Sequence, residues 1–228
     1  MRKQTGHKQG EGITLNNIGL VYNMLGKDSE ALESHQKVLA IRKQINDKAG
    51  EGVTLNNIGL TYSNLGQYPQ ALEFFQQALA IRKQVGDKAG EGITLNNIGY
   101  VLMQTGKLKE ATKTLHTAIE VQELLRPELK DTDKVSIIDT QRNSYRFLQQ
   151  AYIVQKQYQE ALEISERGRA RAFAELLAEK QKTQIEPKPT IKQLKQIAKE
   201  ETPFLGIFAI ASLRFVKFLI NFTRESRF

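Results

Sequence analysis

Apolar residues recur at intervals of three and four along most of this chain, which is the spacing of one face of an α-helix. In residues 50–89 a first stripe contains Leu55, Ile58 and Tyr62, and a second stripe contains Ala71 and Phe75. Polar residues fill the positions between them. The pattern therefore predicts two amphipathic helices in this segment of forty residues.

The same two stripes return with a fixed period. The hexapeptide TLNNIG stands at residues 14–19, 54–59 and 94–99, and residues 10–49 are identical to residues 50–89 at 26 of 40 positions. A period of this length is typical of proteins in which each unit buries its apolar face against the next one. We predict an all-α solenoid of stacked antiparallel helix hairpins, with a short irregular C-terminal tail.

Turn residues stand between the predicted helices. Gly66 is expected to adopt the left-handed conformation that ends the first helix, and Pro69 fits the first turn of the second helix. Gly86 is expected to end the second helix, and Asp87 to cap the helix that follows. These short turns predict that consecutive helices lie side by side.

The spacing of apolar and small residues resembles the tetratricopeptide signature, which Leu55, Ile58, Gly59, Tyr62, Ala71 and Phe75 match. The period of 40 residues is similar to that of kinesin light chains. The resemblance implies that small side chains let the paired helices approach and that aromatic residues pack beside them. The residues to which it gives this packing role are Gly19, Gly59, Gly99, Tyr22, Tyr62, Ala31, Ala71, Ala111 and Ala161.

The repeat pattern divides the chain into segments. The predicted order is residues 1–9 as the remnant of a preceding repeat, 10–49, 50–89 and 90–126 as three repeats, 127–134 as a connection, 135–180 as a diverged fourth hairpin, 181–190 as a linker, and 191–228 as a truncated or frame-shifted start of a further domain. In the fourth hairpin Gln149 replaces the packing glycine.

Residues 161–200 resemble the junction that follows the repeats in CHAT proteins, caspase-like proteins common in cyanobacteria. The resemblance implies that a cysteine–histidine peptidase-like domain would follow, and that this chain is the truncated repeat arm of such a protein. Residues 204–220 are mostly apolar but contain Arg214 and Lys217, and the uninterrupted apolar run is shorter than the ~20 residues that span a bilayer. A basic surface helix at a membrane is the alternative for this segment.

Composition and charge exclude several functions. The chain has no cysteine, and its net charge of +8 is spread among acidic residues rather than gathered in a basic arm, which argues against a nucleic-acid partner. His7, His35 and His116 are not spaced as metal ligands, and His35 stands where Phe75 stands in the next repeat, so we expect it to be packed. We expect no enzymatic activity, catalytic residue, metal, cofactor or small-molecule substrate.

The paired asparagines are the main candidates for ligand contact. In long-repeat relatives such asparagines contact a bound peptide, and the resemblance gives this role to Asn16, Asn17, Asn56, Asn57, Asn96 and Asn97, with Leu20, Leu60 and Tyr100 as neighbours. Amides can donate to and accept from any peptide backbone. The alternative is that the asparagines bond between neighbouring helices and fix how the repeats stack.

The predicted function is binding of an extended peptide or a partner protein in the concave groove of the solenoid. Two alternatives stay open: a regulatory fragment of a CHAT-type cysteine peptidase, and a peripheral membrane protein held by the C-terminal segment. We expect a cytoplasmic location, since no secretory signal is present. Ile13, Leu15 and Ile18 lie on an uncovered first face, which predicts self-association.

Overall fold

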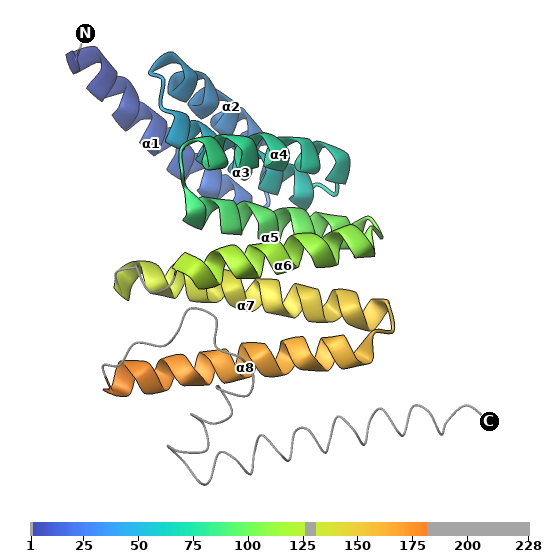
Figure 1. Cartoon of the computed structure of the whole chain (residues 1–228). Helices are drawn as coiled ribbons and strands as arrows, with labels where there is room; N and C mark the ends of the chain where they lie inside the picture. The colour runs from blue at the N-terminus through green and yellow to red at the C-terminus, as the bar shows by residue number, and fades with distance from the viewer. Residues whose placement is uncertain (1, 126–130, 182–228) are drawn as a thin grey trace.

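The computed structural model describes residues 2–125 and 131–181, and the side chains of residues 6–125 and 140–169. Within these residues the chain is helical and contains no strand. The helices are α1 (Arg2–Met24), α2 (Asp28–Gln44), α3 (Lys48–Asn64), α4 (Tyr68–Gln84), α5 (Lys88–Gln104), α6 (Leu108–Leu125), α7 (Asp131–Val154) and α8 (Tyr158–Gln181). Figure 1 shows them as a stack of hairpins that runs from α1 to α8. The predicted all-α solenoid is confirmed.

The turns form as the sequence predicts. Gly66 ends α3 with a φ of 71°, and Gly86 follows α4 with a φ of 73°, the left-handed region in which a side chain is unfavourable. Pro69 lies in the first turn of α4. The Asp87 carboxylate accepts a hydrogen bond from the Gly90 backbone N–H at 2.8 Å and so caps α5.

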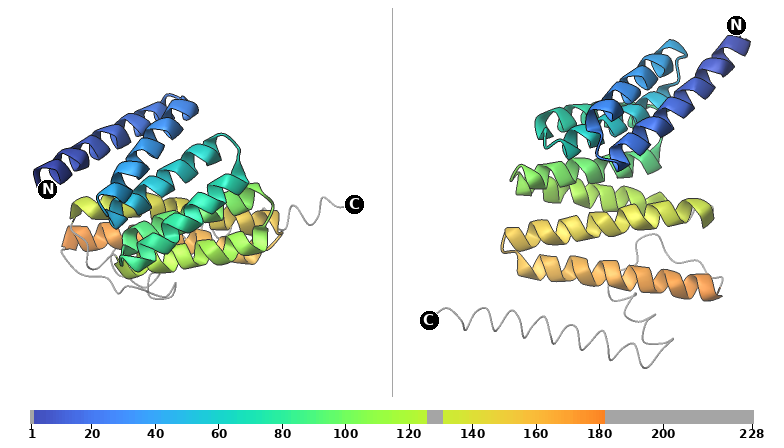
Figure 2. Two further views of the ribbon diagram at one scale, coloured as in Figure 1. Left: turned by 90° about the horizontal axis from the view of Figure 1, so that it is seen from above. Right: turned by 180° about the vertical axis from the view of Figure 1, so that it is seen from behind.

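The hairpins stack so that two kinds of contact alternate. Each helix packs against its partner within the hairpin, and α3, α5 and α7 also pack against the second helix of the hairpin before them. Successive odd-numbered helices contact one another directly, and this contact is more extensive than any between successive even-numbered helices of the described chain. The direction of the hairpins rotates along the stack, as Figure 2 shows, which gives a superhelix whose odd-numbered layer is the more closely spaced one.

Each of the first three hairpins closes around one large side chain that packs against a glycine. Phe75 of α4 is fully buried, and a Cβ atom added at Gly59 of α3 would lie 2.7 Å from its ring. His35 faces Gly19 and Leu115 faces Gly99 in the same way. The paired helices can approach this closely because the glycine has no side chain.

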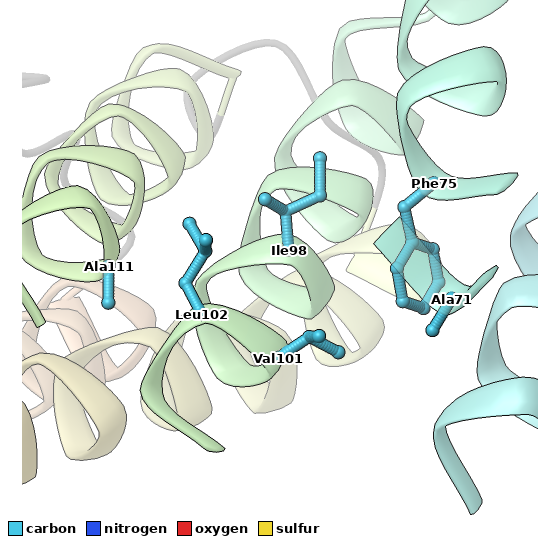
Figure 3. Packing of buried hydrophobic residues seen from close by; sticks show 6 residues of the cluster. All are labelled: Ala71, Phe75, Ile98, Val101, Leu102 and Ala111. Atoms are coloured by element: carbon cyan, nitrogen blue, oxygen red, sulfur yellow. The ribbon is translucent and has the colours of Figure 1, made fainter. Parts of the chain in front are cut away.

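The apolar core runs continuously from one hairpin into the next. Figure 3 shows Phe75 and Ala71 of α4 beside Ile98, Val101 and Leu102 of α5, with Ala111 beyond them. The other predicted packing residues also lie at helix contacts: Ala31 and Ala161 are buried, Tyr22 is half-buried, and the Tyr62 ring stacks on Phe74 at 5.3 Å. The hydrophobic free energy of the fold therefore depends on contacts between repeats as well as within them.

The start of the chain differs from the sequence pattern. Residues 1–9 align with residues 81–89, which contain a turn, yet residues 2–24 form the single helix α1. The difference has a local cause: Asp87 caps α5 and is paired with Arg82, whereas the aligned residue here is His7, which has no carboxylate to cap a new helix. Without that cap the helix continues through Gly6.

Candidate functional site

The candidate ligand residues lie on the odd-numbered helices. Leu20 of α1 is exposed, and Leu60 of α3 and Tyr100 of α5 are half-buried. Each follows the previous one by 40 residues and occupies the same position in its helix. The helices α1, α3 and α5 lie side by side, so these three side chains line up across the stack. We call Leu20, Leu60 and Tyr100 the apolar row.

The apolar row continues onto α7 through aromatic contact. The ring of Phe147 lies 5.1 Å from the ring of Tyr100 and is tilted against it. The exposed guanidinium of Arg146 lies 5.1 Å from the centre of the Phe147 ring, at cation–π distance. This end of the row therefore combines aromatic surface with positive charge.

The asparagines are bonded to one another between repeats. Asn57 Nδ2 donates to Asn16 Oδ1 at 3.0 Å, and Asn97 Nδ2 donates to Asn56 Oδ1 at 3.1 Å. In the next hairpin Ser144 Oγ donates to Asn96 Oδ1 at 2.9 Å. We call this set the asparagine ladder. These hydrogen bonds join neighbouring helices, as expected if the asparagines fix how the repeats stack.

Most of the hydrogen-bonded asparagines are also buried. Asn56, Asn57 and Asn96 expose 4–7% of their surface, Asn16 and Asn97 are half-buried, and Asn17 is exposed. A buried amide that lost its partner would cost about 1–3 kcal/mol, so the ladder fixes which residues of adjacent repeats face each other. Of the six asparagines, Asn17 keeps the most surface open to a ligand, and Asn16 and Asn97 keep part of theirs.

A second contact between consecutive hairpins was not predicted from the sequence. Arg42 of α2 pairs with Asp47, which caps α3, and the Arg82 Nε atom lies 4.0 Å from Asp87 Oδ2. Burial lowers the pKa of Arg82, and Asp87 opposes this shift. Each arginine lies in the last turn of its helix and reaches the aspartate that caps the following helix. The constant spacing of five residues between arginine and aspartate is the signal that could have shown it.

The junction between the third and fourth hairpins has its own polar cluster. Glu123 is buried, accepts a hydrogen bond from the Tyr145 hydroxyl at 2.6 Å, and pairs with Arg167 Nη2 at 2.6 Å. Lysines occupy the positions equivalent to Glu123 in the first two repeats, Lys43 and Lys83. A negatively charged residue thus replaces a positively charged one at the position where the diverged hairpin joins the regular repeats.

The histidines are packed side chains. His35 is fully buried, and burial lowers its pKa to about 4. His116 Nε2 lies 2.6 Å from the Tyr152 hydroxyl oxygen, and its pKa is lowered by burial and by nearby Arg167. No group of acidic or histidine residues in the described part of the chain is arranged to hold a metal ion. The prediction that His35 is packed is confirmed.

Together the fold and these contacts define an α-solenoid of stacked helix hairpins. Two family models, both described as tetratricopeptide repeat, match residues 10–84 and 94–123. These two stretches of the chain are tetratricopeptide repeats, as the sequence predicts. The repeat fold is a scaffold for interaction between proteins and is typically not enzymatic.

Similar proteins share this repeat. Tetratricopeptide repeat protein 28 of Mus musculus and that of Homo sapiens are each 35% identical to this chain over 104 residues. The match covers 43% of this chain and 4% of either relative, so the chain spans a small fraction of their length. The crystal structure of BtubC (BKLC) from P. vanneervenii aligns with 78% of this chain and 68% of that chain, at 16% identity and a TM-score of 0.61, which shows a shared fold.

The predictions for the C-terminal part lie largely outside the described residues. The segment 191–228, which carries the predicted CHAT-like start and the membrane alternative, is not described, and the resemblance to CHAT proteins stays a prediction. Among the described helices, none combines the length and the apolar content needed to cross a bilayer.

Proposed function

We propose that the odd-numbered layer binds an extended peptide segment of a partner protein along the apolar row. The observation that carries the proposal is the row itself: Leu20, Leu60 and Tyr100 repeat every 40 residues on adjacent helices and keep part of their surface open. Such side chains lose solvent contact only when a ligand covers them, which is favourable by about 25 cal/mol per Å².

The geometry favours an extended ligand. Helices that pack directly lie about 8–10 Å apart, and an extended chain rises about 3.3 Å per residue. One repeat therefore spans about three ligand residues, and a peptide with apolar side chains at that spacing fits the row.

The charge at the α7 end favours an acidic residue in the ligand. Arg146 is exposed and lies over Phe147, and no carboxylate partner of Arg146 stands among the described residues. A ligand carboxylate there would gain a charge-assisted hydrogen bond. We assign peptide contact to the apolar row with Arg146, and stacking of the repeats to the bonded asparagines Asn16, Asn56, Asn57, Asn96 and Asn97.

A peptide selection tests this function. A library of random twelve-residue peptides displayed on phage is selected against the full chain, and the affinity of the best peptides is measured by fluorescence anisotropy. Leu60→Ala and Tyr100→Ala are expected to weaken binding at least tenfold, and Arg146→Ala to weaken acidic peptides in particular.

Matched controls separate the site from general surface effects. Tyr158 is an exposed tyrosine at the start of α8, on the even-numbered layer, so Tyr158→Ala is expected to leave binding unchanged. Selected peptides that bind the Leu60 and Tyr100 variants as tightly as the parent would refute the proposed site.

A further inference from the structure

One face of α1 carries the residues that α3 and α5 use for stacking, but nothing in the described chain covers it. We call it the open face. It consists of Glu11, Thr14, Asn17, Ile18 and Val21, which correspond to Glu51, Thr54, Asn57, Ile58 and Thr61 of α3. Four of these five pairs are identical residues.

Exposure of the two faces differs strongly. Ile18 exposes 40% of its surface and Ile58 only 1%, and Val21 exposes 53% whereas Thr61 is fully buried. Glu11, Thr14 and Asn17 are exposed too, while Glu51, Thr54 and Asn57 are buried. In α3 and α5 the preceding hairpin provides the cover.

The preceding hairpin is held against α3 and α5 by hydrogen bonds as well as by apolar contact. On α3, Asn57 donates to Asn16, and the Thr61 hydroxyl donates to Asn23 Oδ1 at 3.0 Å. On α5, Asn97 and Thr94 both donate to Asn56 Oδ1, at 3.1 and 3.3 Å. The acceptors of Asn57 and Asn97 are Asn16 and Asn56, which stand at the same position of the preceding first helix.

We infer that the open face of α1 is a docking surface for a further tetratricopeptide hairpin, one whose first helix has an asparagine at the position of Asn56. Ile18 and Val21 supply the apolar contact, and the Asn17 side chain donates to the asparagine of the incoming hairpin, as Asn57 and Asn97 do. The argument is continuity with the two interfaces inside the molecule, which use the same residues at the same positions.

The far end of a second copy is a poorer occupant. In the fourth hairpin the position of Asn56 is taken by Arg146, which is a donor only and cannot accept a bond from Asn17. Stacking two copies end to end would also bring the guanidinium against Ile18 and Val21. The chemistry therefore selects a hairpin of the regular repeat type over the diverged end of this chain.

An inserted repeat tests the inference in the full chain. A second copy of residues 50–89 is placed between residues 9 and 10, which recreates the junction found before α3 and α5. Hydrogen exchange of the amides of residues 10–25 is expected to slow at least tenfold relative to the parent chain. Ile18→Ala is expected to lower Tm several times more in the extended chain than in the parent.

The control concerns the asparagine of the inserted repeat. Changing its copy of Asn56 to Leu removes the acceptor while keeping the apolar cover, and it should restore part of the fast exchange. Equal exchange in the parent and extended chains, with equally small effects of Ile18→Ala, would overturn the inference. So would a parent chain that dimerises through α1 and becomes monomeric on Ile18→Asp, since a second copy would then be the occupant.

This inference is independent of peptide binding. The variants of the open face leave Leu60, Tyr100 and Arg146 untouched, and the readouts are exchange and Tm. A failed peptide selection would thus leave the docking surface intact, and an unoccupied open face would leave the apolar row intact.

Discussion

Residues 10–49 and 50–89 share 26 of 40 residues and form the same hairpin, yet their first helices have different surroundings. In α3 nearly every residue from Glu51 to Thr61 is buried, whereas among residues 6–24 of α1, whose side chains are described, only Gly12 and Gly19 are buried. The two glycines face the partner helix inside the hairpin. The comparison shows that the hairpin buries one side of its first helix and that the neighbouring repeat buries the other.

The largest expected contrast is between equivalent isoleucines. Ile58→Ala should reduce the free energy of unfolding by about 2–5 kcal/mol because it opens a cavity in a closed interface. Ile18→Ala should cost less than about 1 kcal/mol, since solvent already reaches that side chain. Urea unfolding followed by circular dichroism measures both. Equal losses for the two variants would mean that the open face is covered in solution.

The next contrast is between His35 and Phe75, which pack against equivalent glycines, and it concerns how stability depends on pH. His35 is neutral in the fold because burial lowers its pKa from 6.5 to about 4, so the unfolded chain binds the extra proton. Stability supplied by neutral His35 is complete above pH 6.5 and is lost as pH falls towards 4, by about 3 kcal/mol.

The variant His35→Phe copies the second repeat, where Phe75 occupies this position. Thermal unfolding of the parent and the variant between pH 7 and pH 4 is compared. We expect the parent to lose more stability over this range than the variant. Parallel pH profiles would mean that folding does not lower the pKa of His35.

Glycine substitutions should have opposite signs at two positions in these helices. Gly59→Ala is expected to destabilise by about 1–3 kcal/mol, because the new Cβ atom would lie 2.7 Å from the buried ring of Phe75. Gly10→Ala in α1 meets no atom within 4 Å and should stabilise by about 0.5–1 kcal/mol through helix propensity. Chemical denaturation of the two variants checks the sign, and a stabilising Gly59→Ala would contradict the packing described.

The smallest contrast concerns the asparagine ladder. Asn57→Ala removes the donor to Asn16 in a nearly closed site and should cost about 1–2 kcal/mol. Asn17→Ala removes an exposed amide and should change stability by less than about 0.5 kcal/mol. Tm measured by differential scanning calorimetry is the readout. If both variants kept the parent Tm, the ladder would not contribute to stacking.

Much of the fold could be predicted from local patterns. The turns at Gly66 and Gly86, the cap by Asp87 and the first turn at Pro69 depend on the conformational preferences of single residues, which do not need a partner far along the chain. The close approach at Gly59 was predictable because the repeat places Phe75 at a fixed spacing from it. The continuous helix through residues 2–9 was not predicted, because a missing cap is weaker evidence than an aligned repeat.

The candidate site was predicted less completely. Leu20, Leu60 and Tyr100 are identified by period alone, but Phe147 and Arg146 are not, because the fourth hairpin is out of phase with the others by ten residues. The arginine–aspartate pairs were not predicted. Both the contact of Phe147 with Tyr100 and the arginine–aspartate pairs depend on how far one helix is shifted along the next, which the sequence pattern does not give.

The sequence by itself determined the repeat length, the hairpin, its turns and the stripe that each helix buries against its partner. Those features follow from interactions between residues close together in the chain, and identical copies therefore form them identically. Only the tertiary structure decided that Asn56 and Asn96 accept hydrogen bonds, that Asn57 and Asn97 donate them, and that Ile18 stays exposed while Ile58 is buried. The physical reason is that two identical helices acquire different environments from the neighbours against which they are stacked.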